Sequence, residues 1–239
     1  MANTLATVRA AVLRSLDRSG VTATESGDID RWINQAIRED ICQDHNWAFM
    51  ETQTDVATVL NQESYAFPVA STFKDCQAIF FRRVSTEDWM RLQESHYDFL
   101  QDQFTAQVKG VPSVWARRGE NYVLRAIPDA STYSMRVLSW NYPVELVADA
   151  DTNTLLTNYS ALVEAAVIRR GLLHYGEDAR LQVWEQLYQQ ARMRSLRADR
   201  ARLGASDLWL NISFDAGKKS AGLQRGGRVA RPAAYSWNV

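Results

Sequence analysis

Apolar residues recur with a helical period at both ends of the chain, and this pattern constrains the fold more than any other feature. A first stripe lies within residues 5–16, where Asn3 or Thr4 can cap the helix, and a second lies within residues 29–47. Two antiparallel helices follow from these stripes. We therefore assign residues 1–49 to a helical hairpin.

The middle of the chain, residues 50–157, has the composition of β-strands. β-Branched and aromatic residues flank the polar stretch LNQE in TQTDVATV and SYAFPVA, which predicts a hairpin, and DCQAIFFRRV predicts a third strand. A helical period over residues 86–104 predicts one helix. After GVP, the segments VWARR, NYVLRAI and YSMRVLSWNYP are separated by turn-forming residues and predict a β-meander.

The helical period returns from about Asn158, and Gly176 interrupts it, which predicts a second helical hairpin over residues 158–203. The apolar stripe of the last helix consists of Leu181, Trp184, Leu187 and Tyr188. These segments together predict a mainly α fold with a β insertion. It would combine an antiparallel bundle of about four helices, a small antiparallel β subdomain and an extended C-terminal arm over residues 204–239.

Charge and composition narrow the class of protein. The 27 basic and 28 acidic residues nearly cancel, which argues against a surface that coats nucleic acid as a whole. The two cysteines, Cys42 and Cys76, fit buried thiols in a reduced compartment. No stretch reaches the roughly 18 apolar residues of a membrane helix, and the start of the chain lacks a signal-peptide pattern. We expect a cytoplasmic protein that contacts no membrane.

No cluster of residues predicts catalysis, a metal site or a cofactor. His45, His96 and His174 are dispersed along the chain. RRGENY is typical of a hairpin turn rather than a nucleotide-binding loop. DADTNT lacks the central glycine and closing glutamate of a calcium loop, which favours a linker into the next helix. Adjacent carboxylates such as Glu39 and Asp40 point to different sides of a helix, a poor geometry for acid–base chemistry. We therefore expect a protein that is not an enzyme.

Five arginines crowd the end of the last long helix, and two interpretations of them stay open. They are Arg192, Arg194, Arg197, Arg200 and Arg202. Positive charge near a helix C-terminus is favourable by itself and increases solubility. The same arginines could instead form an electropositive surface that meets phosphate or an acidic partner, either at a subunit boundary or facing DNA.

The segment from Gly204 to Val239 combines glycine and basic residues with large aromatic residues, unlike a plain flexible linker. Segments that fold onto a partner keep such residues as anchors. Ordering these 36 residues would cost on the order of 50 kcal/mol, which requires about 2,000 Å² of apolar burial against a large partner. We expect a docking arm whose contact residues are Trp209, Phe214, Lys218, Lys219, Arg225, Arg228, Arg231, Tyr235 and Trp237.

The order of the motifs resembles that of the head-to-tail adaptor (connector) proteins of tailed bacteriophages, most closely the short-tailed kind. The resemblance covers roughly residues 1–203 and rests on RWINQAIREDICQDHNWAFMETQT, SYAFPV, GVPSVWARRGENYVLRAIPDASTYSMRVLSWNYPVEL and DTNTLLTNYSALVEAAVIRRGLLHYGEDARLQVWEQLYQQARMRSL. Its short signatures are the tryptophan that closes the second helix and the PDAS turn.

This resemblance implies a structural virion protein, assembled in the host cytoplasm into a homo-oligomeric ring beneath the portal protein. Such rings are commonly twelvefold, extend the channel through which the packaged double-stranded DNA passes, and offer a platform for tail nozzle or tail fibre proteins. They close through heterologous interfaces. C-terminal extensions in the family often grip the portal, which the resemblance implies for the arm of this chain.

Two other functions stay open from the sequence. One is a tail-completion protein of the same region of the virion. The other is a nucleic-acid-binding protein that uses the arginine-rich helix end and the Gly/Arg tail, with Tyr235 and Trp237 stacking on bases. The near-neutral net charge argues against the second.

Overall fold

The computed structural model describes residues 3–18, 22–68, 71–103, 108–176 and 178–203. The chain divides into a compact unit of Met1–Ser195 and a second unit of Leu196–Val239. The described part of the second unit consists of the last turns of one long helix.

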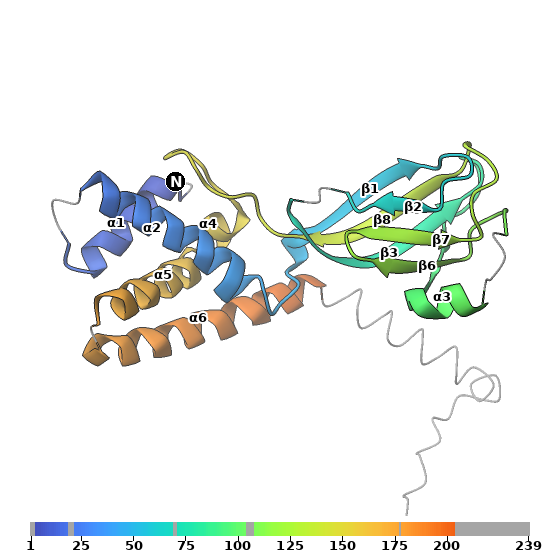
Figure 1. Cartoon of the computed structure of the whole chain (residues 1–239). Helices are drawn as coiled ribbons and strands as arrows, with labels where there is room; N and C mark the ends of the chain where they lie inside the picture. The colour runs from blue at the N-terminus through green and yellow to red at the C-terminus, as the bar shows by residue number, and fades with distance from the viewer. Residues whose placement is uncertain (1–2, 19–21, 69–70, 104–107, 177, 204–239) are drawn as a thin grey trace, which may run out of the picture. The chain divides into compact units, whose positions relative to one another are not determined.

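Apart from α3, the helices of the described chain come from residues 5–50 and 154–203 (Figure 1). They are α1 (Leu5–Ser15), α2 (Ala23–Gln35), its π-helical continuation η1 (Ala36–Ile41), the short 3-10 turn η2 (Ala48–Met50), α3 (Tyr97–Gln103), α4 (Thr154–Asn158), α5 (Ser160–Tyr175) and α6 (Asp178–Leu203).

Local sequence signals explain where several helices begin and end. Thr4 caps α1 together with Thr7, so the expected cap is confirmed, and Thr22 and Glu25 form a capping box at the start of α2. Gly176 ends α5 with φ 71°, a left-handed conformation that glycine adopts without steric cost. This confirms the break predicted at Gly176.

Eight strands in the described residues form two four-stranded sheets. The strands are β1 (Glu51–Ala57), β2 (Ser64–Ala66), β3 (Phe73–Arg82), β4 (Met90–Arg91), β5 (Gln93–Ser95), β6 (Val114–Arg118), β7 (Asn121–Arg125) and β8 (Ser134–Asn141). One sheet has the order β1-β8-β3-β4 and the other has the order β2-β7-β6-β5.

The two sheets share one hydrophobic core. Buried side chains from both contact one another, including Phe81 and Val137 from the first sheet and Trp115, Tyr122 and Leu124 from the second. Burying apolar area on this scale, at roughly 25 cal/mol per Å², makes the β part a folding core in its own right.

The predicted fold class, a mainly α bundle with a small β subdomain, is wrong. The structure is a mixed α/β fold, in which 44% of the described residues are helical and 24% are in strands. The error has a physical reason: β1 pairs with β8 at Glu51↔Trp140, and β3 also pairs with β8, so one sheet joins segments far apart in the sequence. Local patterns reveal strands but not such distant pairing, which is decided by the burial of one face of each sheet in the core between them.

Three smaller predictions in the middle of the chain are also wrong for this reason. β1 and β2 do not form a hairpin, because β2 pairs with β7 in the other sheet. β6 and β7 pair as expected, but β8 pairs with β3 in the first sheet, so these three strands do not form a meander. Residues 86–104 contain β4, β5 and only the short α3, because Leu92 is buried in the sandwich core while its neighbours extend along the sheets.

Within the helical part, α1, α2 and α5 pack closely around Gly171. A Cβ atom on this residue would lie 2.9 Å from Leu16 Cδ1 and 3.4 Å from Trp32 Cζ3. Leu16 and Trp32 are themselves buried. The absent side chain at Gly171 therefore lets α5 approach both neighbouring helices.

Replacing Gly171 by valine is expected to destabilise the protein by about 1–3 kcal/mol, since the added methyl groups overpack this contact. Gly27→Val is the matched control, because a Cβ at Gly27 meets nothing within 4 Å and valine has a better helix propensity than glycine. Urea unfolding followed by far-UV circular dichroism measures both. Equal midpoints for the two variants would contradict the packing role of Gly171.

Candidate assembly surfaces

The described residues bring no catalytic or metal-binding cluster together. Among them, no group of three or more His, Cys, Asp or Glu side chains could hold a metal ion. Burial raises the pKa of Cys42 and of Cys76 to about 12, so neither thiol is a ready nucleophile. The imidazole of His45 packs against Trp47 with ring centroids 4.8 Å apart. In the described chain, no helix is long and apolar enough to span a membrane.

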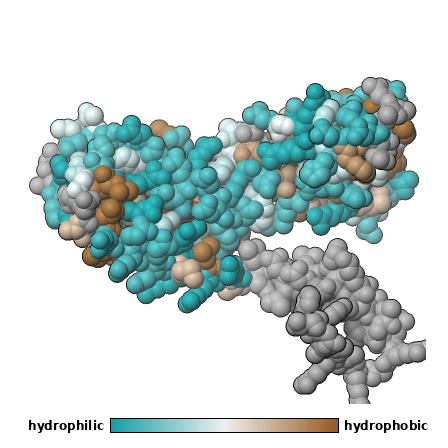
Figure 2. Space-filling model, turned by 60° about the horizontal axis from the view of Figure 1, so that its bottom comes forward, coloured by the Kyte–Doolittle hydropathy of each residue, from teal (hydrophilic) through white to brown (hydrophobic). Residues whose placement is uncertain are grey.

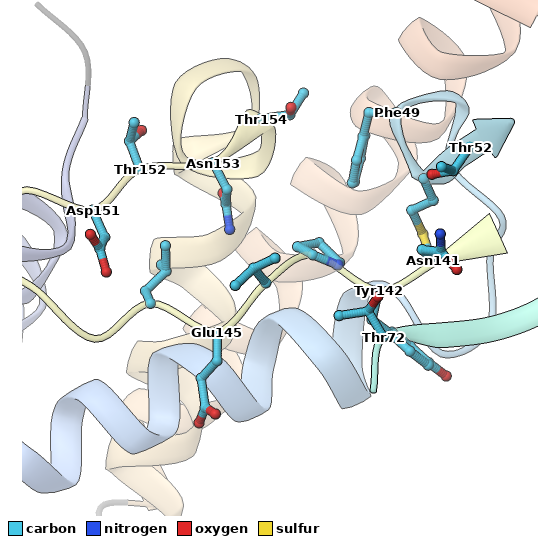
Figure 3. Close-up of a pocket in the computed structure, with 14 residues that line it drawn as sticks. Phe49, Thr52, Thr72, Asn141, Tyr142, Glu145, Asp151, Thr152, Asn153 and Thr154 are labelled. Carbon is cyan, nitrogen blue, oxygen red and sulfur yellow. The ribbon is translucent and has the colours of Figure 1, made fainter. Parts of the chain in front are cut away.

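The segment between β8 and α4, residues 142–153, lies over a pocket of about 600 Å³ and is called the strap below. Phe49 and Thr52 line the pocket opposite the strap (Figure 3). The strap carboxylates of Glu145 and Asp151 lie apart in Figure 3 and do not converge on a common point. The pocket therefore lacks the paired acid and base that chemistry on a substrate would need.

Hydrogen bonds fix the strap to the helices. The Asn34 side chain donates to Leu146 O at 2.8 Å and accepts from Leu146 N at 2.9 Å. The backbone N–H of Leu5 donates to Asp151 O at 2.9 Å. The sequence predicted a linker into the next helix over DADTNT, residues 149–154. The signal that was missed lies just before this run, where Val144, Leu146 and Val147 are apolar and Leu146 is buried.

Asp151 also organises the strap internally. Its carboxylate accepts hydrogen bonds from Val147 N and Ala148 N, both at 2.8 Å. These bonds hold the pKa of Asp151 below its ordinary value of 3.8. The acidic run DADTNT thus has structural roles, since Asn153 caps α4 by accepting from Leu156 N. The helical segment expected from about Asn158 thus begins earlier, because α4 starts at Thr154.

Asp40 is the centre of an ion-pair network that joins η1, α5 and α6. Its carboxylate pairs with Arg170 at 2.6 Å and with Arg169 at 3.2 Å. Arg169 also pairs with Glu185 of α6 at 3.2 Å, and the Tyr188 hydroxyl donates to Asp40 O at 2.8 Å. Asp40 is therefore a structural group rather than a free surface charge, and its side chain is only 13% exposed.

The five predicted arginines all lie on α6, but not in equivalent positions. Arg192 pairs with Asp44 at 3.3 Å and is half-buried, so part of its role is structural. Arg194, Arg197, Arg200 and Arg202 are exposed. Leu187, which was predicted to face the core, is 41% exposed. The proposed subunit or DNA contacts of the arginines stay a prediction.

The predicted docking arm lies outside the described residues. Its named contacts are Trp209, Phe214, Lys218, Lys219, Arg225, Arg228, Arg231, Tyr235 and Trp237. Their role stays a prediction.

Comparisons with known proteins give one match over most of the chain. The family model described as SU10 adaptor protein matches residues 3–208. Isoleucine–tRNA ligase of a Synechococcus species is 26% identical over 151 residues, which is 62% of this chain but 15% of that enzyme. Because the shared stretch is a small part of the ligase, this similarity carries no conclusion about activity.

Removing the Asp151 carboxylate is expected to loosen the strap. In Asp151→Ala, the amides of Val147 and Ala148 lose their acceptor, so their hydrogen exchange at neutral pH should accelerate at least about tenfold. Glu145→Ala is the matched control, because the Glu145 side chain is exposed on the same strap. Unchanged exchange in Asp151→Ala would show that other contacts hold the strap.

We expect the strap to become less stable on acidification. The fold lowers the pKa of Asp151, so the hydrogen bonds of its carboxylate stabilise the strap fully at pH values above the unfolded pKa of 3.8. This stabilisation is lost as the pH falls through the lower pKa of the folded state. Limited proteolysis at neutral and acidic pH checks this. Acidification should increase cleavage within the strap in the wild type but should cause no further increase in Asp151→Ala.

Proposed function

Because the chain belongs to the SU10 adaptor protein family, we propose that it forms the ring that joins the portal protein to the tail in a bacteriophage virion. At the coarser level that the family gives, it is a structural phage adaptor and a component of the virion. The observation that carries the proposal is the family match over residues 3–208, which includes every described element.

The ring would be a homo-oligomer, expected to be twelvefold, of the kind found in short-tailed phages. It would assemble in the host cytoplasm, extend the channel for the packaged double-stranded DNA, and offer the attachment platform for tail nozzle or tail fibre proteins. A ring needs two different contact faces on each subunit. The described chain supports this by presenting exposed large apolar side chains in several places, among them Val59, Val147 and Leu173.

Residues 204–239 would act as an arm that docks on the portal. Tyr235 and Trp237 would serve as anchors, and the basic residues of the arm would meet acidic or polar portal surface. Ring symmetry repeats each arm, so contacts that are weak singly add to a tight joint.

Imaging tests the ring and the arm together. Full-length protein is mixed with DNA-filled heads that lack tails, and the portal vertex is imaged by electron cryomicroscopy. We expect a closed ring beneath the portal. Deleting residues 217–239 should remove most of the bound density, while a control with the same 23 residues in scrambled order distinguishes sequence-specific anchoring from charge. A vertex without any ring would overturn the proposed function, and full binding by the deletion variant would overturn the arm.

A salt series separates this proposal from a nucleic-acid-binding protein. For an adaptor, purified full-length protein should show no tight binding to free duplex DNA at physiological salt. A steep dependence of log K on the logarithm of the salt concentration would favour the rival function. In that case Arg194→Glu or Arg197→Glu should reduce the slope by about 0.9 per lost phosphate contact. Arg91→Glu, at an exposed arginine of β4, is the matched control.

A further inference from the structure

Two valines of the strap are exposed in an unusual degree. Val144 is 74% and Val147 is 81% exposed, more than any other large apolar side chain among the described residues. Leu146 between them is buried at 5%. One side of the strap therefore packs on the protein, and the other presents two branched apolar side chains outward.

The exposure of these valines is not that of a loosely held loop. Leu146 is bound through both backbone groups by Asn34, and Val147 and Ala148 donate to Asp151. Arg9 pairs with Asp149 at 2.8 Å. Because the strap is already ordered, a partner that covers the valines gains apolar burial at little cost in conformational entropy.

A groove lies between α5 and α6, and its lining includes two leucines. It has a volume of about 500 Å³ and is lined by Arg169, Leu173, Leu181, Gln182, Glu185 and Gln186. Leu173 is 58% exposed, and Val183 and Leu187 on the outward side of α6 are 57% and 41% exposed. Two valine side chains could pack against the apolar side chains of Leu173 and Leu181 in this groove.

The strap and the groove lie on different sides of the helical part. The strap is bonded to α1 and α2, through Leu5, Arg9 and Asn34. The groove belongs to α5 and α6, and Figure 1 shows the strap above α2 and α6 below α5. A subunit therefore cannot fill its own groove with its own strap, but the strap of one copy can meet the groove of the next. This is the geometry of a heterologous contact, which forms a ring when the rotation between successive copies closes.

Charge supports a second copy as the occupant. Residues 142–153 contain three carboxylates and no basic residue, whereas α6 up to Ser195 contains three arginines and two carboxylates, and Arg169 of α5 also lines the groove. Arg9 offsets one strap carboxylate, although Asp149 remains 72% exposed. The excess charges of the two surfaces are of opposite sign, which favours their encounter and penalises the pairing of like surfaces.

We propose that the strap of one subunit docks in the α5–α6 groove of its neighbour, with Val144 and Val147 against Leu173 and Leu181. This rests on the proposed ring and adds to it the contact that joins successive subunits.

Crosslinking on assembled heads tests the contact. The full-length variant Val147→Cys/Leu173→Cys is bound to DNA-filled tail-less heads and treated with a short bismaleimide. We expect a ladder of covalent oligomers on a denaturing gel. The matched control Val59→Cys/Leu173→Cys places one thiol in the loop after β1, at a residue that is 51% exposed, and should give no ladder. Wild type and the single variants control for Cys42 and Cys76.

A charged side chain at position 147 tests the same contact without thiols. Val147→Asp should reduce the fraction of heads that carry a closed ring by about tenfold or more, because the loss recurs at every interface. Val59→Asp should leave that fraction unchanged. Complete rings without a Val147/Leu173 ladder, or complete rings of Val147→Asp, would overturn the contact while leaving the proposed function intact. Absence of rings from the wild type would overturn the proposed function itself, and the contact with it.

Discussion

The arrangement of α6 on the helical part depends on how the carboxylate of Asp40 is satisfied. A half-buried charge without partners would cost several kcal/mol, and here Arg169 and Arg170 of α5 both reach it. The π-helical turn η1, in which Cys42 N donates to Ile37 O, offers the Asp40 backbone oxygen to the Tyr188 hydroxyl. α6 is thus attached by polar contacts whose geometry fixes its rotation.

This rotation decides what α6 presents to solvent. With Tyr188 turned inward and Glu185 paired to Arg169, the residues on the opposite side of the helix, including Val183 and Leu187, must face outward. At the other side of the bundle, Asn34 holds Leu146 inward and leaves Val144 and Val147 exposed. Both apolar surfaces follow from polar contacts beneath them.

The sequence predicted what local physics determines and missed what distant contacts determine. The Thr4 cap and the Gly176 break were predictable, because side-chain capping and left-handed glycine act within one turn. The mixed α/β fold was not, because β8 could be recognised as a strand but its partners β1 and β3 could not. Leu187 was misplaced because a stripe of apolar residues does not say which side polar contacts will pull inward. The candidate docking strap was missed for the same reason, since the bonds of Asn34 span 112 residues.

A subunit that folds before it enters a ring has to keep exposed apolar surface small, since large continuous patches cause premature association. In the view of Figure 2 the most hydrophobic atoms form separate patches divided by hydrophilic surface. A single small patch binds a second copy weakly, whereas a closed ring repeats the contact at every interface and leaves no free edge. Under the proposed function, scattered apolar patches on rigid supports therefore keep the free subunit monomeric. Subunits gather at the portal vertex, and their high local concentration there lets the ring close.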